Sequence, residues 1–161
     1  YRQLYGAIVG FSGRGEMIAR YENYCTVDPN VVDRYGIPVL RFHVKWSDEE
    51  IRQARHMQET GREIIRAMGG EPLDEMPGPE RGYGITKPGE IIHEAGTTRM
   101  GRDPKTSVLN PFCQAHDVPN LFVVDAGPFV SMPHKNPTWT ILALAWRTAD
   151  YIVEQRKQGN L

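Results

Sequence analysis

Residues 47–70 read SDEEIRQARHMQETGREIIRAMGG and contain the clearest helix signal in the chain. Ser47 and Glu50, three positions apart, match a capping box, in which each side chain binds a free backbone N–H at a helix start. Apolar residues then recur every three or four positions and form one stripe, which is typical of a helix packed on one side. The two final glycines suit a left-handed C-cap. We therefore predict a helix over residues 47–68.

The residues before this helix are typical of strands and turns. Positions 39–46 alternate between two sets of side chains, which predicts a half-buried strand. The set expected to face inward is Leu40, Phe42, Val44 and Trp46. A shorter strand is expected at residues 24–27, followed by a turn at Asp28-Pro29-Asn30.

The residues after the helix combine an irregular segment with two further elements. Residues 70–90 are rich in proline and are expected to form an exposed irregular excursion. The apolar run at residues 121–125 predicts a strand covered on both faces. A second helix is expected to begin at Asn136-Pro137, because Asn is a favoured N-cap and Pro a favoured first residue, and to run to about Arg156. Its first half is apolar nearly all round, which predicts that it is buried.

Composition limits the class of protein. The chain has 161 residues, of which 40% are hydrophobic and 24% charged, with a net charge of −1. These values exclude a disordered polyelectrolyte and give no reason to expect a nucleic-acid partner. The longest apolar stretch is far shorter than the roughly 20 residues of a membrane span. Two cysteines leave the redox compartment open, and because the chain begins at Tyr1 we expect a piece of a longer protein of unknown localisation.

Two motifs fail their spacing tests. Gly13-Arg14-Gly15 lacks the third glycine of a dinucleotide-binding loop, because Ile18 stands in its place, so a turn between strands is predicted. His93-Glu94 resembles the start of a zinc-binding helix, but Thr97 stands where the second histidine is required. The sequence therefore predicts no metal site.

Two other segments are candidate sites. His93 follows an apolar pair and precedes a run rich in glycine and threonine, which can approach a bound group and donate hydrogen bonds to it. It is either a structural histidine at a strand end or a site residue. Asn136 lies at a helix start, where free N–H groups stabilise negative charge. It is either a cap or a site residue, and His134 adds a second polar side chain nearby.

Three segments together resemble the C-terminal part of the glucose–methanol–choline (GMC) family of flavoprotein oxidoreductases. They are His93-Glu94-Ala95-Gly96-Thr97-Thr98-Arg99-Met100-Gly101, Asn120-Leu121-Phe122-Val123-Val124-Asp125-Ala126, and residues 136–150, from Asn136-Pro137-Thr138 to Arg147-Thr148-Ala149-Asp150. Their order and separations also fit. A looser likeness extends toward the N-terminus, through residues 15–17, 27–29 and 35–39.

The resemblance implies roles for individual residues. His93 and Asn136 match the family's catalytic pair, in the His-plus-Asn form that resembles pyranose and other sugar oxidoreductases. Asp125 and Ala126 match a stretch that touches FAD, and Pro137 and Thr138 match a helix start that faces the flavin. His134 departs from the commonest patterns; it either lines the substrate pocket, serves as a spare base or lies on the surface.

The resemblance also implies an α+β fold in two parts. Residues 1–106 would form part of the substrate-binding domain, an antiparallel sheet with the helix at 47–68 against one face. Residues 107–161 would form a return segment whose strand and helix complete an FAD-binding domain. The N-terminal half of that domain would lie outside this chain and be its partner.

The function implied is oxidation of a CH–OH group of a sugar or polyol by hydride transfer to FAD. A neutral imidazole at His93 suits the role of base near pH 7. The electron acceptor stays open among oxygen, a quinone and a cytochrome. The main alternative is a non-catalytic carbohydrate-binding or assembly module of the same fold without flavin. A metal hydrolase is a more distant alternative.

Overall fold

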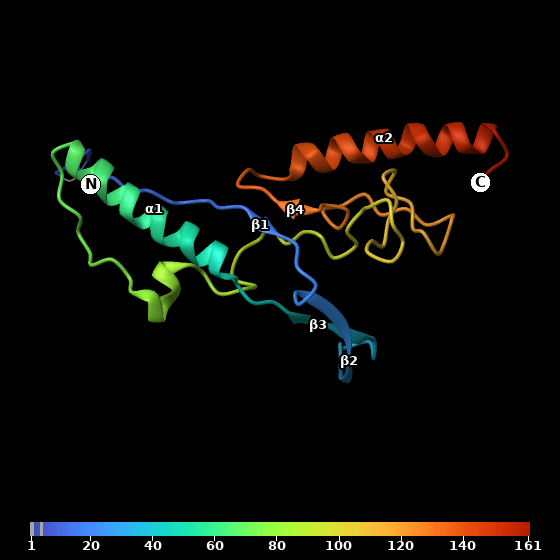
Figure 1. The fold of residues 1–161 in the computed structure, drawn as a ribbon, viewed down its shortest axis with the longest axis horizontal. Coiled ribbons are helices and arrows are strands. Elements are labelled where there is room, and N and C mark those ends of the chain that lie inside the picture. Colours follow the sequence, from blue (N-terminus) through green and yellow to red (C-terminus); the bar gives the residue numbers. More distant parts are fainter. Residues whose placement is uncertain (1, 4) are drawn as a thin grey trace. The chain divides into compact units, whose positions relative to one another are not determined.

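The computed structural model describes residues 2, 3 and 5–161 and has an α+β fold with short antiparallel sheets (Figure 1). Its elements are β1 (Met17–Ile18), β2 (Tyr24–Val32), β3 (Pro38–His43), α1 (Asp48–Ala67), the 3-10 helix η1 (Pro79–Gly84), β4 (Ser131–Met132) and α2 (Thr138–Lys157). The chain divides into two compact units. The first contains the described residues up to Gly15 and Trp46–Thr86; the second contains Glu16–Lys45 and Lys87–Leu161.

Helix α1 has the ends that its sequence predicts. The Ser47 N–H donates to Glu50 Oε2 at 2.6 Å, and the Ser47 side chain accepts from the Glu49 N–H at 3.2 Å, so the capping box is confirmed. Glu50 is buried as a result. At the other end Gly69 has φ +80°, the left-handed conformation that glycine adopts without strain.

The glycine-rich segment in the first unit lies against α1. A Cβ added at Gly13 would stand 2.4 Å from Sδ of Met57, and one at Gly15 would stand 2.7 Å from Oε1 of Gln53. Strand β1 begins at Met17, just after these glycines, but no strand precedes them among the described residues, so the predicted turn between strands is wrong. The glycines instead let the backbone approach the helix where any side chain would clash.

The segment that follows α1 is irregular, as predicted, but it is tied to the helix. Arg62 donates to the backbone oxygen of Asp74 at 2.7 Å, and the Trp46 indole donates to the backbone oxygen of Thr86 at 2.8 Å. The Arg55 guanidinium lies 5.8 Å from the centre of the Tyr83 ring, within η1. A hydrogen bond to Glu59 raises the pKa of Arg55. The excursion therefore forms part of the first unit's packing.

Strands β2 and β3 form a hairpin in the second unit. Their register pairs Tyr24 with His43 and Val27 with Leu40, with an irregularity before Val32. The predicted turn at residues 28–30 lies inside β2, where Asp28 Oδ1 accepts the N–H groups of the two residues after Pro29. The true turn comes later, because Asp33 accepts hydrogen bonds from two further backbone N–H groups.

The hairpin's apolar side chains are not buried. Leu40 and Phe42, predicted to face inward, are 57% and 56% exposed, and the strand ends at His43. Each sheet in the described residues has only two strands, which is too few to enclose a core. The predicted packing of α1 on this sheet involves both units and stays a prediction.

The core of the second unit lies among loops. Leu109 and Cys113 are fully buried, and Phe129 is 6% exposed. The predicted strand at residues 121–125 is wrong, since it contributes a single bridge, from Phe122 to Gln114, among the described residues. A strand forms only where neighbouring strands pair along it, and the described residues give 121–125 only this bridge.

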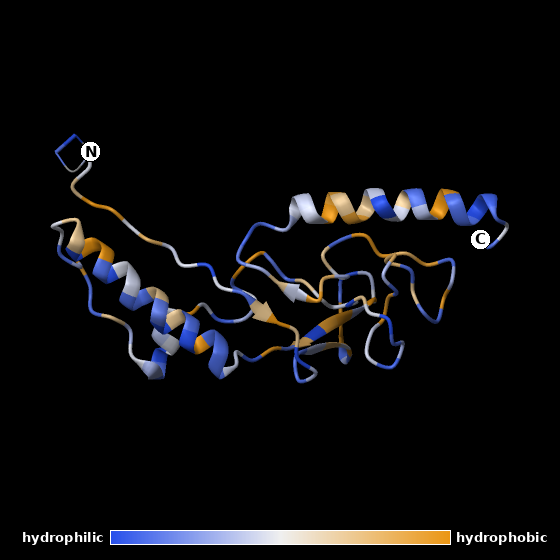
Figure 2. Cartoon of the chain, turned by 45° about the horizontal axis from the view of Figure 1, so that its top comes forward, coloured by the Kyte–Doolittle hydropathy of each residue, from blue (hydrophilic) through white to orange (hydrophobic). Residues whose placement is uncertain are grey.

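Helix α2 packs on the core with one face only. Thr148 is fully buried and donates from Oγ1 to the backbone oxygen of Phe112 at 3.2 Å, and Tyr151 stacks on the Phe112 ring with centroids 4.2 Å apart. Apolar residues also occupy its N-terminal half (Figure 2), yet Trp139 and Trp146 are 87% and 74% exposed. The predicted burial of this half is wrong within the described residues, because these two tryptophans stay mostly exposed. Among the described residues no helix combines the length and apolar character that a membrane crossing requires.

Candidate functional site

Three backbone hydrogen bonds join the His93 segment to the Asp125 segment. Gly96 N–H donates to Ala126 O at 3.1 Å, Thr98 N–H to Gly127 O at 3.2 Å, and Met100 N–H to Pro128 O at 3.0 Å. The two segments lie about thirty positions apart in the sequence. Two of the three motifs singled out in the sequence therefore lie side by side in the second unit.

The turn after Asp125 is closed by its own side chain. Asp125 Oδ1 accepts the Gly127 N–H at 2.6 Å, and Gly127 is buried. A Cβ at Gly127 would stand 2.2 Å from Oγ1 of Thr98, so no side chain fits there. This local geometry holds the Asp125 carboxylate at the edge of the paired segments.

His93 lies in an irregular segment and is half-buried. Its imidazole has no hydrogen-bond partner within residues 2, 3 and 5–161. No strand ends at His93, so the interpretation as a structural histidine at a strand end finds no support. Both ring nitrogens are free to bind a ligand or move a proton.

The segment that carries His134 and Asn136 is positioned by β4. Its strand pairs with β1, matching Met132 with Met17, and Ser131 Oγ donates to Glu16 Oε1 at 3.1 Å. Both His134 and Asn136 are exposed, and neither side chain has a hydrogen-bond partner in the described part of the chain.

The start of α2 lacks a side-chain cap. The helix begins at Thr138, later than predicted, and the buried residue Pro137 occupies the cap position. Pro137 has helical dihedral angles (φ −84°, ψ −14°), and the Asn136 side chain makes no hydrogen bond to the helix start among the described residues. Of the two interpretations of Asn136, cap or site residue, the cap therefore finds no support. The first N–H groups of the helix keep their partial positive charge without a side-chain partner. They suit a group that carries negative charge.

The structure leaves part of the predicted site untested. No hydrogen bond between described residues connects His93, His134 and Asn136, so their convergence on one pocket stays a prediction. Within the described residues no three His, Cys, Asp or Glu side chains are grouped as metal ligands. The sequence did not predict the close approach of Thr98 to Gly127. The glycine and threonine content of the two segments was the only feature of the sequence that pointed to it.

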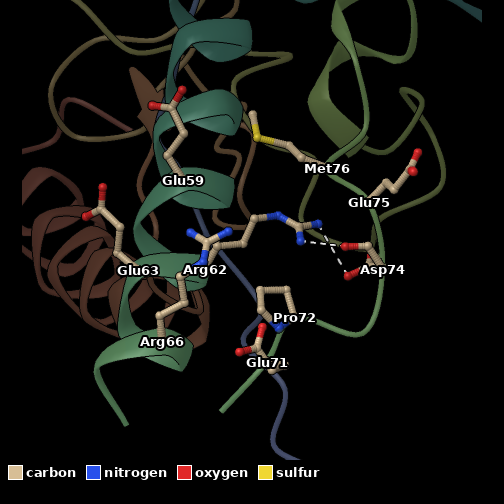
Figure 3. Close-up of a pocket in the computed structure, with 9 residues that line it drawn as sticks. All are labelled: Glu59, Arg62, Glu63, Arg66, Glu71, Pro72, Asp74, Glu75 and Met76. Atoms are coloured by element: carbon tan, nitrogen blue, oxygen red, sulfur yellow. Dashed lines mark hydrogen bonds and ion pairs between the residues drawn. The ribbon is translucent and has the colours of Figure 1, made fainter. Parts of the chain in front are cut away.

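The first unit contains a cleft that is lined by residues between Glu59 and Met76 (Figure 3). Arg62 reaches from α1 toward Asp74 and binds both its backbone oxygen and its carboxylate. The cleft is lined by Glu59, Arg62, Glu63, Arg66, Glu71, Pro72, Asp74, Glu75 and Met76. It is the junction between α1 and the segment tied to it, and it contains none of the predicted site residues.

Comparison with known proteins gives a consistent result. The family model described as GMC oxidoreductase matches residues 20–145. The chain is 38% identical over 134 residues to a gluconate 2-dehydrogenase flavoprotein of Pantoea cypripedii, covering 83% of this chain and 22% of that protein. It is 37% identical over 156 residues to a C-glycoside 3-oxidase of Arthrobacter globiformis, covering 93% and 28%. A pyranose 2-oxidase of Tricholoma matsutake is 31% identical over 152 residues, covering 89% and 26%. The chain thus spans about a quarter of the length of these relatives.

Proposed function

This chain belongs to the GMC oxidoreductase family, and on that premise we propose that it is the C-terminal part of an FAD-dependent enzyme. The proposed reaction is oxidation of a CH–OH group of a sugar or polyol. The names of the relatives support this substrate class, since they include a C-glycoside 3-oxidase, a pyranose 2-oxidase and a gluconate 2-dehydrogenase flavoprotein.

One observation carries the proposal: the hydrogen bonds that hold the Gly96–Met100 backbone against Ala126–Pro128. This pairing brings the segment with the proposed base close to the segment with the proposed cofactor contacts. A histidine with a purely structural role is normally hydrogen-bonded to a neighbouring group, whereas the His93 imidazole has no such partner among the described residues.

In the proposed mechanism His93 accepts the proton of the substrate hydroxyl. A neutral imidazole is suited to this near pH 7, and a positioned base is worth about 10²–10⁴ in rate. Asn136 donates an amide hydrogen bond to the substrate oxygen and so orients the reacting carbon. Its carboxamide is available for this because it does not cap α2. His134 is a second pocket candidate beside it.

The residues proposed to hold the cofactor are Asp125, Ala126, Pro137 and Thr138. FAD, when bound, supplies the acceptor for the hydride that leaves the substrate carbon. The uncapped start of α2 fits such a group, because its N–H groups stabilise negative charge that develops beside Pro137 and Thr138. Asp125 contributes a carboxylate acceptor that a cofactor hydroxyl can bind.

The proposed division of the chain follows from the same assignment. Residues 1–106 belong to the substrate-binding domain, and residues 107–161 complete the FAD-binding domain. The exposed apolar side chains of α2 support this, because a contiguous exposed apolar surface marks an interaction site. The portion of the relatives that this chain does not span is long enough to supply the covering surface.

The test uses the full-length protein. We expect a yellow flavoprotein whose absorbance is bleached by a sugar or polyol without oxygen. His93→Ala should abolish this bleaching while FAD stays bound, and His56→Ala, at an exposed histidine of α1, should leave it unchanged. Bleaching of the His93 variant at the wild-type rate would exclude His93 as the base. A colourless protein that still binds sugar would support the non-catalytic alternative.

A further inference from the structure

One buried hydroxyl in the second unit has no partner. Among the described residues the buried side-chain atoms without a hydrogen bond are Thr98 Oγ1, Arg20 Nε and Arg62 Nε. Both arginines bond through other nitrogens of the same guanidinium group, to Lys45 and to Asp74. Thr98 alone of the three has its entire polar group unpaired. Such a group is costly in a folded protein and calls for an explanation.

The hydroxyl lies beside the Asp125 carboxylate. The point where a Cβ on Gly127 would stand is 2.2 Å from Thr98 Oγ1 and 2.8 Å from Asp125 Oδ1, so both oxygens crowd the same space. The Thr98 backbone is fixed there by its N–H bond to Gly127 O. An O–H donor is therefore held next to a carboxylate acceptor without a bond between them.

The Asp125 carboxylate has further capacity to accept. Its Oδ1 takes the Gly127 N–H, and the residue as a whole is exposed. An ionised carboxylate accepts about four hydrogen bonds. A second donor would fix the rotation of the side chain and aim its other oxygen outward, which lowers the ordering cost of binding a hydroxyl-bearing ligand there.

We propose that Thr98 is a positioning residue for Asp125, whose carboxylate it binds through its hydroxyl when that carboxylate accepts a hydrogen bond from a hydroxyl of FAD. The inference rests on the proposed function. The hydrogen bond from Thr98 to Asp125, which is absent in this structure, forms when the ligand binds. This explains why position 98 carries a buried hydroxyl that has no partner without the ligand.

The test is Thr98→Val in the full-length protein, because valine keeps the shape and removes the O–H. The dissociation constant for FAD should rise by about tenfold or more, as for a lost hydrogen bond to a charged group. The melting temperature of the apoprotein should stay the same or rise, since an unpaired buried hydroxyl is removed. Thr98→Ser keeps the donor and should retain affinity close to that of the wild type.

Thr148→Val is the matched control. Its hydroxyl is equally buried but donates to Phe112 O, so this variant should lower the apoprotein melting temperature and leave FAD affinity unchanged. Unchanged FAD affinity in Thr98→Val would overturn the inference, and so would a drop in its apoprotein melting temperature like that of the control. If the wild type itself binds no FAD, the proposed function fails as well; if it binds FAD and Thr98→Val binds equally, only this inference fails.

Discussion

The two long helices have the same length but differ in how their ends are capped. Both contain 20 residues. Helix α1 is capped by Ser47 at its start and followed by a left-handed glycine at its end. Helix α2 starts without a side-chain cap after Pro137. The cap groups of α1 come from residues adjacent in sequence, whereas the first N–H groups of α2 have no such partner.

The faces of the two helices differ in the same way. The glycine-rich segment and the residues after Gly70 pack along α1 within its own unit. Helix α2 packs through Thr148 and Tyr151, while Trp139 and Trp146 on another face stay exposed. Helix α1 thus has segments of its own unit along one side, whereas Trp139 and Trp146 of α2 stay exposed among the described residues.

The largest effect is expected on the exposed face of α2. If the remainder of a full-length protein covers this face, Trp146→Glu should destabilise that protein by about 3–5 kcal/mol, through lost packing and a buried charge. The same substitution in the 161-residue chain should change stability by less than about 0.5 kcal/mol, as for other surface positions. Urea unfolding of both forms measures this.

Asp150→Asn is the control on the same helix, at an exposed position. It should leave both forms unchanged. Equal, small effects of the tryptophan variant in both forms would show that the face is never covered and would remove the contrast between the helices.

A smaller effect is expected where α1 meets the glycine-rich segment. Gly13→Ala places a methyl group against the Met57 side chain and should cost about 1–3 kcal/mol, the usual penalty of overpacking. Thermal unfolding of the 161-residue chain is the measurement. Gly10→Ala is the matched control, because a Cβ there meets nothing within 4 Å. Equal melting temperatures for the two variants would contradict the close packing on α1.

The smallest pair of effects compares the helix starts. Ser47→Ala should lower stability by about 1 kcal/mol, the usual value of a lost N-cap. Asn136→Ala should change stability by less than about 0.5 kcal/mol, because Asn136 does not cap α2. In the full-length enzyme Asn136→Ala should instead lower kcat/KM, and the corresponding loss of transition-state binding energy should be a few kcal/mol at most. A stability loss like that of Ser47→Ala, with kcat/KM unchanged, would return Asn136 to a capping role.

The sequence predicted those features whose interactions are local. The bounds of α1 agree to within a residue at each end, because Ser47, Glu50 and Gly69 act on backbone groups within a few positions. The family was predicted from three short motifs, and the family comparison confirms it. The catalytic roles of His93 and Asn136 stay predictions. The structural support for them is that neither side chain has a hydrogen-bond partner among the described residues.

The wrong expectations about burial and strand pairing concern contacts with distant residues. The apolar alternation of 39–46 predicted a buried face that a two-stranded hairpin cannot provide. The run at 121–125 predicted a strand, but a strand exists only where neighbouring strands pair with it. An apolar pattern indicates that a face can be buried, but it does not indicate which part of the protein covers that face.

The amino-acid order by itself therefore determined α1, its caps and the motifs of the family, since hydrogen bonds within one helical turn need no distant partner. Tertiary structure alone decided that the Gly96–Met100 backbone pairs with Ala126–Pro128 and that the Thr98 hydroxyl lies unpaired beside Asp125. Those contacts bridge about thirty residues of chain, so no pattern within either segment specifies them.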